Sequence, residues 1–153
     1  MAMLDRLFPS PVDNDYQGHS VALWLFVPVT VVTIVRSLIH MFRVDGGAQS
    51  IATIPLDTFS DAAATVVILI FSLWGLSQLL LGLLYVVVLI RYRALVPLMY
   101  LTLIIEYFGR LGLGFWKPMQ TLERPPGAGF TGFMIVFSLL MFTLSLRRRA
   151  FSR

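Results

Sequence analysis

The segment Thr102–Arg110, with the sequence Thr-Leu-Ile-Ile-Glu-Tyr-Phe-Gly-Arg, places a carboxylate and a guanidinium inside an otherwise apolar stretch. Glu106 and Arg110 are four residues apart, so on a helix they share a face and can contact each other. The surrounding stretch is long and apolar enough to cross a bilayer, where a charged side chain costs several kcal/mol unless it is paired. We therefore expect the fold to be organised around this pair.

The composition of the 153-residue chain is that of a membrane protein. Hydrophobic residues make up 58% and charged residues 13%, and the mean hydropathy is +0.82, whereas soluble domains carry roughly 25% charged residues. The lack of cysteine excludes disulfides, thiolate metal sites and a catalytic thiol. The formal charge is +4, but the arginines gather at segment ends, as topology signals do, so we expect no nucleic-acid partner.

Hydropathy predicts an all-α, polytopic membrane protein in which four transmembrane helices form a bundle. A span needs roughly 20 apolar residues to cross a hydrocarbon layer of about 30 Å, and the fourth span is near the minimum. We expect residues 1–153 to form a single transmembrane domain, with a cytoplasmic N-terminal segment at 1–19 and a basic cytoplasmic tail at 147–153. The predicted spans are residues 20–42, 62–90, 94–115 and 130–146.

The second predicted span carries a face of small and polar residues that lets a neighbouring helix approach closely. We expect it to be the packing face of this span; its members are Ser72, Gly75, Gln78, Gly82 and Tyr85. The span is longer than a perpendicular crossing needs, which implies tilt or a first turn outside the bilayer. Thr58, Ser60 and Asp61 precede it and are typical helix N-cap residues.

Lysine and arginine are distributed unequally between the two sides of the predicted bundle. Seven lie on the side of the termini, against three on the other side; they are Arg6, Arg91, Arg93, Arg147, Arg148, Arg149 and Arg153, against Arg43, Lys117 and Arg124. The positive-inside rule then predicts that both termini are cytoplasmic. With no transit-like N-terminus, we expect a bacterial inner (plasma) membrane.

The middle of the chain has a recognisable pattern. Gly-Leu-Ser-Gln-Leu-Leu-Leu-Gly at 75–82 is followed by aliphatic residues, the basic turn Arg91-Tyr92-Arg93 and an apolar helix that closes with Phe108-Gly109-Arg110. This pattern resembles the second and third helices of small four-helix DoxX-like membrane proteins, a group that includes a subunit associated with a terminal quinol oxidase. The resemblance covers about a third of the chain and implies the four-helix fold; it brings no catalytic motif with it.

A second group of polar residues lies on the first predicted span, where Thr33, Arg36, Ser37 and His40 recur at intervals of three and four. With a rise of 1.5 Å per residue, Arg36, His40, Glu106 and Arg110 fall in the same, outer half of the membrane. We expect the first and third spans to contribute this polar cluster, with Glu106 between two arginines. The candidate ligand-binding or structural residues are Arg36, His40, Gln78, Glu106 and Arg110.

Three interpretations of this cluster remain open. In the first, its charges neutralise each other and lock helices together. In the second, the charges bind an anionic or carbonyl headgroup, such as a lipid phosphate or a quinone. In the third, Glu106 and His40 relay protons.

Gln78 is an interhelical hydrogen-bonding residue or a ligand donor. His19 and His40 stand about 31 Å apart on one helix, so we expect no metal site.

No phosphate-binding glycine loop, serine nucleophile elbow or pair of carboxylates within the spans is present in the sequence, so we expect no catalytic residues. The leading functional hypothesis is a non-catalytic accessory or structural subunit that packs against a larger membrane complex, such as a respiratory one, or against copies of itself. The alternative is a small lipid- or quinone-binding membrane protein, an enzyme or a carrier. Neither requires a cofactor beyond a bound lipid or quinone.

Overall fold

The computed structural model describes residues 3–147, and its regular elements are all helical. Four helices are long and apolar enough to cross a membrane: α2 (Ser20–Phe42), α3 (Asp61–Arg91), α4 (Val96–Trp116) and α5 (Pro126–Leu146). A short helix, α1 (Met3–Leu7), and two 3₁₀ turns, η1 (Leu56–Thr58) and η2 (Arg93–Leu95), complete this part of the chain. The predicted fold of four spanning helices is confirmed, and the chain is an integral membrane protein.

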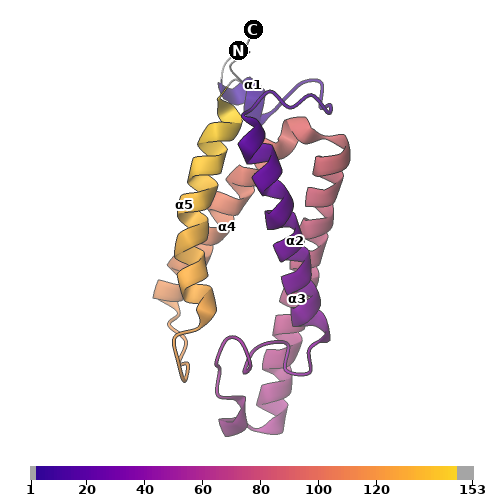
Figure 1. Ribbon diagram of the computed structural model, residues 1–153. Helices are drawn as coiled ribbons and strands as arrows, with labels where there is room; N and C mark the ends of the chain where they lie inside the picture. The colour runs from indigo at the N-terminus through magenta and orange to yellow at the C-terminus, as the bar shows by residue number, and fades with distance from the viewer. Residues whose placement is uncertain (1–2, 148–153) are drawn as a thin grey trace.

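The spanning helices form two hairpins, α2 with α3 and α4 with α5. Figure 1 shows α1 and the last turn of α5 together at one end of the bundle, which we call the near end. The loops that join α2 to α3 and α4 to α5 lie at the opposite, far end, and α3 turns into α4 at the near end. The described chain therefore begins and ends at the same end of the bundle.

Two helix boundaries show how local sequence sets the fold. Ser60 caps α3, and its hydroxyl accepts a hydrogen bond from the Ala63 amide at 3.4 Å, so the predicted N-cap is present. Helix α5 begins at Pro126, four residues before the predicted span, because proline in the first turn needs no amide hydrogen bond and favours a helical φ angle. Of the predicted basic tail, residues 148–153 lie outside the described residues.

Helices α2 and α3 pack through the small-residue face predicted for α3. A Cβ atom placed on Gly75 would lie 2.8 Å from the Cβ atom of His40 and 3.0 Å from the carbonyl oxygen of Ser37. One placed on Gly82 would lie 2.8 Å from Cγ1 of Ile34. These approaches are too close for any side chain, so both positions require glycine. The close approach predicted for this face is present at Gly75 and Gly82, where the neighbouring helix is α2, whereas Gln78 of the same face contacts α4.

We predict that Gly75→Ala destabilises the protein by about 1–3 kcal/mol, because the added methyl group must push α2 away. The matched control is Gly109→Ala on α4, where an added Cβ meets nothing within 4 Å. It should leave stability within about 1 kcal/mol of the wild type. Unfolding by SDS titration in mixed micelles, followed by circular dichroism, measures both. Equal losses for the two variants would contradict the packing described here.

The near half of the bundle contains the apolar core. Phe26 of α2 packs against Tyr85 of α3 and Tyr100 of α4, with ring centroids 5.0 and 5.3 Å apart. The Tyr100 hydroxyl donates a hydrogen bond of 2.7 Å to the carbonyl oxygen of Ala22, so this buried polar group is satisfied. Met141 of α5 completes the same cluster. All four spanning helices are therefore joined in this half.

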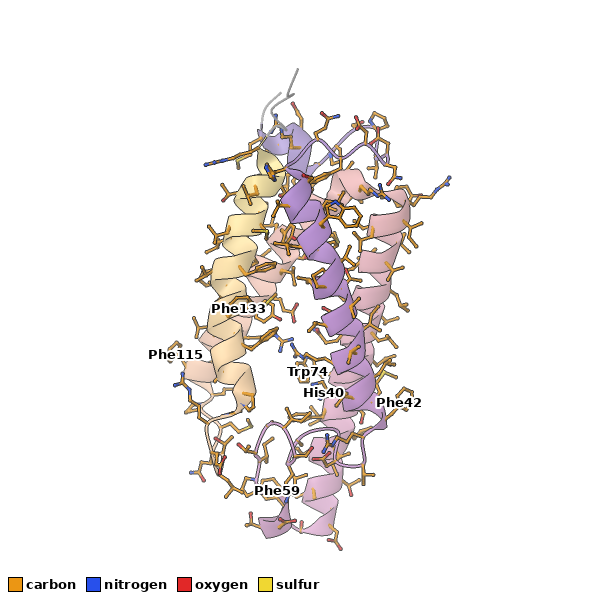
Figure 2. The ribbon with its side chains drawn as sticks, in the orientation of Figure 1. His40, Phe42, Phe59, Trp74, Phe115 and Phe133 are labelled. Atoms are coloured by element: carbon orange, nitrogen blue, oxygen red, sulfur yellow. The ribbon has the colours of Figure 1, made fainter. Side chains whose placement is uncertain are left out.

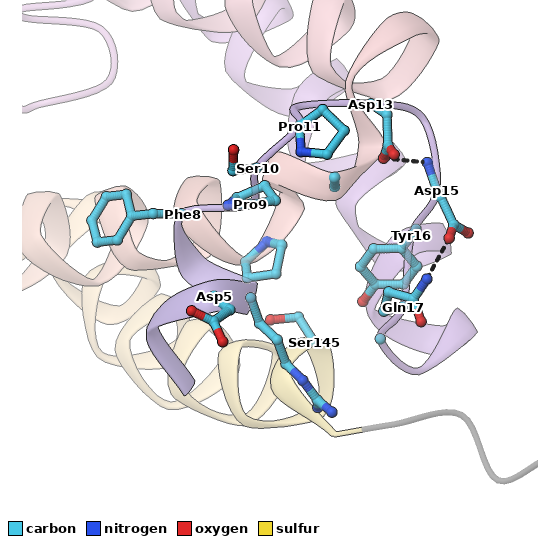
Figure 3. A pocket seen from close by; sticks show the side chains of 14 residues that line it. Asp5, Phe8, Pro9, Ser10, Pro11, Asp13, Asp15, Tyr16, Gln17 and Ser145 are labelled. Atoms are coloured by element: carbon cyan, nitrogen blue, oxygen red, sulfur yellow. Dashed lines mark hydrogen bonds between the residues drawn. The ribbon is translucent and has the colours of Figure 1, made fainter. Parts of the chain in front are cut away.

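The N-terminal segment crosses the near end and ties it together. The Arg6 guanidinium donates to the carbonyl oxygen of Leu146, and the Ala94 amide donates to the Asp13 carbonyl oxygen at 3.3 Å. A hollow of about 430 Å³ lies beneath this segment, and Figure 3 shows the side chains that line it. Asp13 and Asp15, which line it, already accept hydrogen bonds from within the segment. Ala94, Pro97 and Ser145 complete the lining, so the hollow lies between the N-terminal segment and the near ends of α4 and α5.

At the far end, the loop between α2 and α3 folds over the first turns of α3. Ala48, Ile54 and Leu56 are buried and pack against residues 64–71 of α3. This cover accounts for the unusual length of α3, whose first turns lie against the loop. The loop also reaches the other hairpin, because the Leu122 amide donates to the Thr53 carbonyl oxygen at 2.9 Å and the Thr53 hydroxyl to the Glu123 carbonyl oxygen at 2.8 Å.

The tight turn that starts this loop is organised by Asp45. Its carboxylate accepts hydrogen bonds from the amides of Gly47 and Ser50, at 3.0 and 2.7 Å. Burial alone would raise the pKa of this carboxyl. The hydrogen bonds from Ser50 and Gly47, together with the positive charge of Arg43, outweigh burial and lower the pKa to about 2.

We predict that Asp45→Asn destabilises the protein at neutral pH and that this difference disappears in acid. The folded-state pKa of about 2 lies below the usual 3.8, so the carboxylate stabilises the fold above about pH 4 and loses this effect as the pH falls toward 2. Thermal unfolding midpoints of both proteins between pH 2 and 7 measure it. A difference that stays constant across this range would contradict the role given to Asp45.

Candidate functional site

The structure brings the five predicted site residues together between the two hairpins, from the middle of the bundle toward its far end. Arg36 and His40 come from α2, Gln78 from α3, and Glu106 and Arg110 from α4. Figure 2 shows His40 beside Trp74 on the inner side of the α2–α3 hairpin, whereas Phe42 and Phe115 point outward. What this arrangement does depends on how the charges are paired.

One oxygen of Glu106 is the centre of the hydrogen bonding. Its Oε1 atom accepts from Nε of Arg110 at 3.0 Å, from Nη2 of the same guanidinium and from Nε2 of Gln78 at 3.0 Å. The Glu106 and Arg110 side chains are 21% and 24% exposed, so the pair is largely shielded by protein. The bond to Gln78 joins α4 to α3 and thereby one hairpin to the other.

Arg36 does not take the partner expected for it. Among residues 3–147 it forms no ion pair with Glu106; the pairs present are Arg110–Glu106 and Arg43–Asp45. Its guanidinium carbon lies instead 5.7 Å from the ring centre of Trp74 and 5.8 Å from that of Phe130. The expectation that Glu106 sits between two arginines is therefore corrected. The carboxylate links the second and third spans, and Arg36 has aromatic rings in place of a counter-charge.

Trp74 occupies the centre of the cluster. The Arg110 guanidinium carbon lies 4.8 Å from its ring centre, on the same indole that Arg36 approaches, and both distances are typical of cation–π contacts. The His40 ring is 4.6 Å away from the Trp74 ring. Within this cluster, the first and third spans therefore meet at a tryptophan of the second span and through a hydrogen bond between Arg36 and Tyr107, not through a salt bridge.

His40 is held in place by the turn that follows α2. Its Nδ1 atom donates to the carbonyl oxygen of Gly46 at 2.7 Å, since a carbonyl can only accept. In the neutral ring this leaves Nε2 as an acceptor. Among residues 3–147, no three His, Asp or Glu side chains are placed to hold a metal ion.

Two aromatic residues of this site were not identified from the sequence. Phe130 of α5 lies by Arg36, and the Tyr107 ring centre lies 5.4 Å from the Arg110 guanidinium carbon. Tyr107 precedes Arg110 by three residues, so helical spacing could have placed it on the same face. No comparable signal identifies Phe130, because it comes from another helix.

The far ends of α4 and α5 are not covered by the rest of the described chain. The last buried residue of α4 is Tyr107, and the first of α5 is Met134. Cβ atoms added at Gly109 and Gly112 on α4, or at Gly132 on α5, would meet nothing within 4 Å. The cluster is therefore flanked by helix surface that membrane lipid or another molecule can reach.

Comparison of the chain with protein-family models, with curated proteins and with solved structures finds no match. The resemblance to DoxX-like proteins therefore stays a prediction.

We predict strong coupling between Glu106 and Arg110. Glu106→Gln leaves a guanidinium without its counter-charge and should cost about 2–3 kcal/mol, somewhat less than for a fully buried pair, because both side chains are partly exposed. The double variant Glu106→Gln/Arg110→Gln should lose less than the sum of the two single losses. SDS titration in mixed micelles measures all four proteins. Additive losses would show that the two side chains act independently.

Proposed function

We propose that this protein binds one lipid-soluble molecule between its hairpins and holds the anionic or carbonyl oxygen of that molecule with Arg36. The observation that carries this proposal is that Arg36 has no acidic partner within the described range 3–147. Arg36 is partly buried beside Trp74 and Phe130, and the nearby carboxylate is engaged by Arg110 and Gln78. A guanidinium at this depth without an anion is costly, and a ligand oxygen would lower that cost.

The open flank of α4 gives such a molecule a way in. Ile105 and Phe108 are exposed at 64% and 48%, and the positions beyond them carry small residues, Gly109 and Gly112. A ligand with an apolar tail can therefore enter sideways from the bilayer. By the positive-inside rule both termini are cytoplasmic, which puts the cluster in the outer half of the membrane, in a bacterial inner membrane on our proposal.

The test is native mass spectrometry of the full chain purified in mild detergent. We predict one bound lipid or quinone per chain in the wild type and its loss in Arg36→Gln. Arg43→Gln is the matched control: Arg43 is more exposed, at 51%, and pairs with Asp45 outside the cluster. A wild-type chain with no bound molecule, or equal retention by Arg36→Gln, would contradict the proposal.

A second candidate function is an accessory subunit of a larger membrane complex, and the uncovered far ends of α4 and α5 favour it. Phe115 and Trp116 are exposed at 80% and 75%, and the nearby glycines would allow a partner helix to approach. This candidate makes a different prediction for the same preparation. Partner chains would be recovered with the protein, and Arg36→Gln would not release them.

A further inference from the structure

The formal charges within the cluster do not cancel. Arg36 and Arg110 contribute two positive charges, and Glu106 contributes one negative charge, which is already paired with Arg110. The only other ion pair among residues 3–147 joins Arg43 to Asp45, whose carboxylate is also occupied by the turn amides. One unit of positive charge, centred on Arg36, is therefore left within the membrane-spanning part of the protein.

We infer that the ligand is an anionic phospholipid, bound through its phosphodiester group; this inference rests on the function proposed above. A quinone is neutral and would leave the surplus charge on Arg36 in place. A phosphodiester carries one negative charge and cancels it. Its oxygens also match the paired N–H groups of a guanidinium, which is why arginine is so often found at phosphate sites.

The surroundings of Arg36 fix how a phosphate can approach. Trp74 of α3 and Phe130 of α5 lie within 6 Å of its guanidinium carbon, one from each hairpin. One side-chain hydrogen bond joins Arg36 to Tyr107 of α4. The aromatic contacts leave the other N–H groups available, because those donors point outward in the plane of the guanidinium. Arg36 lies six residues before the end of α2 at Phe42, about 9 Å of helix, and a long side chain can span much of that depth to meet a headgroup.

The lipid's acyl chains have a place beside the same site. The flank of α4 at Ile105 and Phe108 is apolar and exposed, and no side chain fills the space next to Gly109 and Gly112. An acyl chain on this surface would lie in continuity with the bilayer while the phosphate contacts Arg36. The result is a lipid held by its headgroup between the hairpins, not a soluble anion in an enclosed pocket.

The test is a competition among chemically defined ligands. The full chain is reconstituted in nanodiscs with equal amounts of phosphatidylglycerol and phosphatidylcholine plus ubiquinone, then released and analysed by native mass spectrometry. We expect one phosphatidylglycerol per chain, and Arg36→Gln should reduce its occupancy about tenfold, the loss of one charge-assisted interaction. Arg43→Gln should change it less than about twofold, as expected for an exposed pair.

Each outcome separates this inference from the proposed function. Preferential retention of ubiquinone or phosphatidylcholine would overturn the anionic phospholipid and leave the proposed function standing, whereas retention of nothing would overturn both. Displacement of the lipid by millimolar inorganic phosphate would show a site for free phosphate and contradict a lipid site. If Arg36→Gln fails to fold, Arg36→Lys is measured instead, because lysine keeps the charge without the paired donors. Intermediate occupancy of Arg36→Lys by phosphatidylglycerol supports the inference. Occupancy equal to that of the wild type contradicts paired recognition of the phosphate.

Discussion

One carboxylate oxygen joins the two hairpins in the far half of this protein. Oε1 of Glu106 accepts hydrogen bonds from Arg110 on its own helix and from Gln78 on the opposite hairpin. An acid within a membrane span needs such partners, because its ionised form is costly in hydrocarbon. Because Arg110 pairs with Glu106, the positive charge of Arg110 is already balanced. The consequence is that the remaining arginine of the cluster, Arg36, has aromatic neighbours and no counter-charge in the described part of the chain.

The two halves of the bundle therefore differ in how they are held together. In the near half, Phe26, Tyr85 and Tyr100 form a closed apolar core to which all four helices contribute. In the far half, α4 has no buried residue after Tyr107 and α5 has none before Met134. The hairpins contact each other there through polar and aromatic side chains and through the loop around Thr53. The packed core of the near half keeps the helices in register, while the far half leaves the surfaces of α4 and α5 accessible to a ligand.

Hydropathy and helical spacing were enough to predict much of this arrangement. The four spans, the pairing of Glu106 with Arg110 and the close approach at Gly75 and Gly82 all follow from patterns within single helices. Contacts between helices were harder to predict, because spacing gives the face of a residue but not the neighbour that this face meets. Arg36 could therefore be placed on a polar face while its contact with Phe130, from α5, could not be foreseen.

The central claim is that Glu106 is ionised and held by Arg110 and Gln78, which leaves the positive charge of Arg36 without an acidic partner among residues 3–147. The most direct measurement is the infrared difference spectrum between the wild type and Glu106→Gln in lipid bilayers at neutral pH. We predict that the variant loses intensity from the carboxylate stretching bands. Loss of a protonated carboxyl C=O band in its place would contradict the claim, because a neutral Glu106 would not pair with Arg110 as an ion.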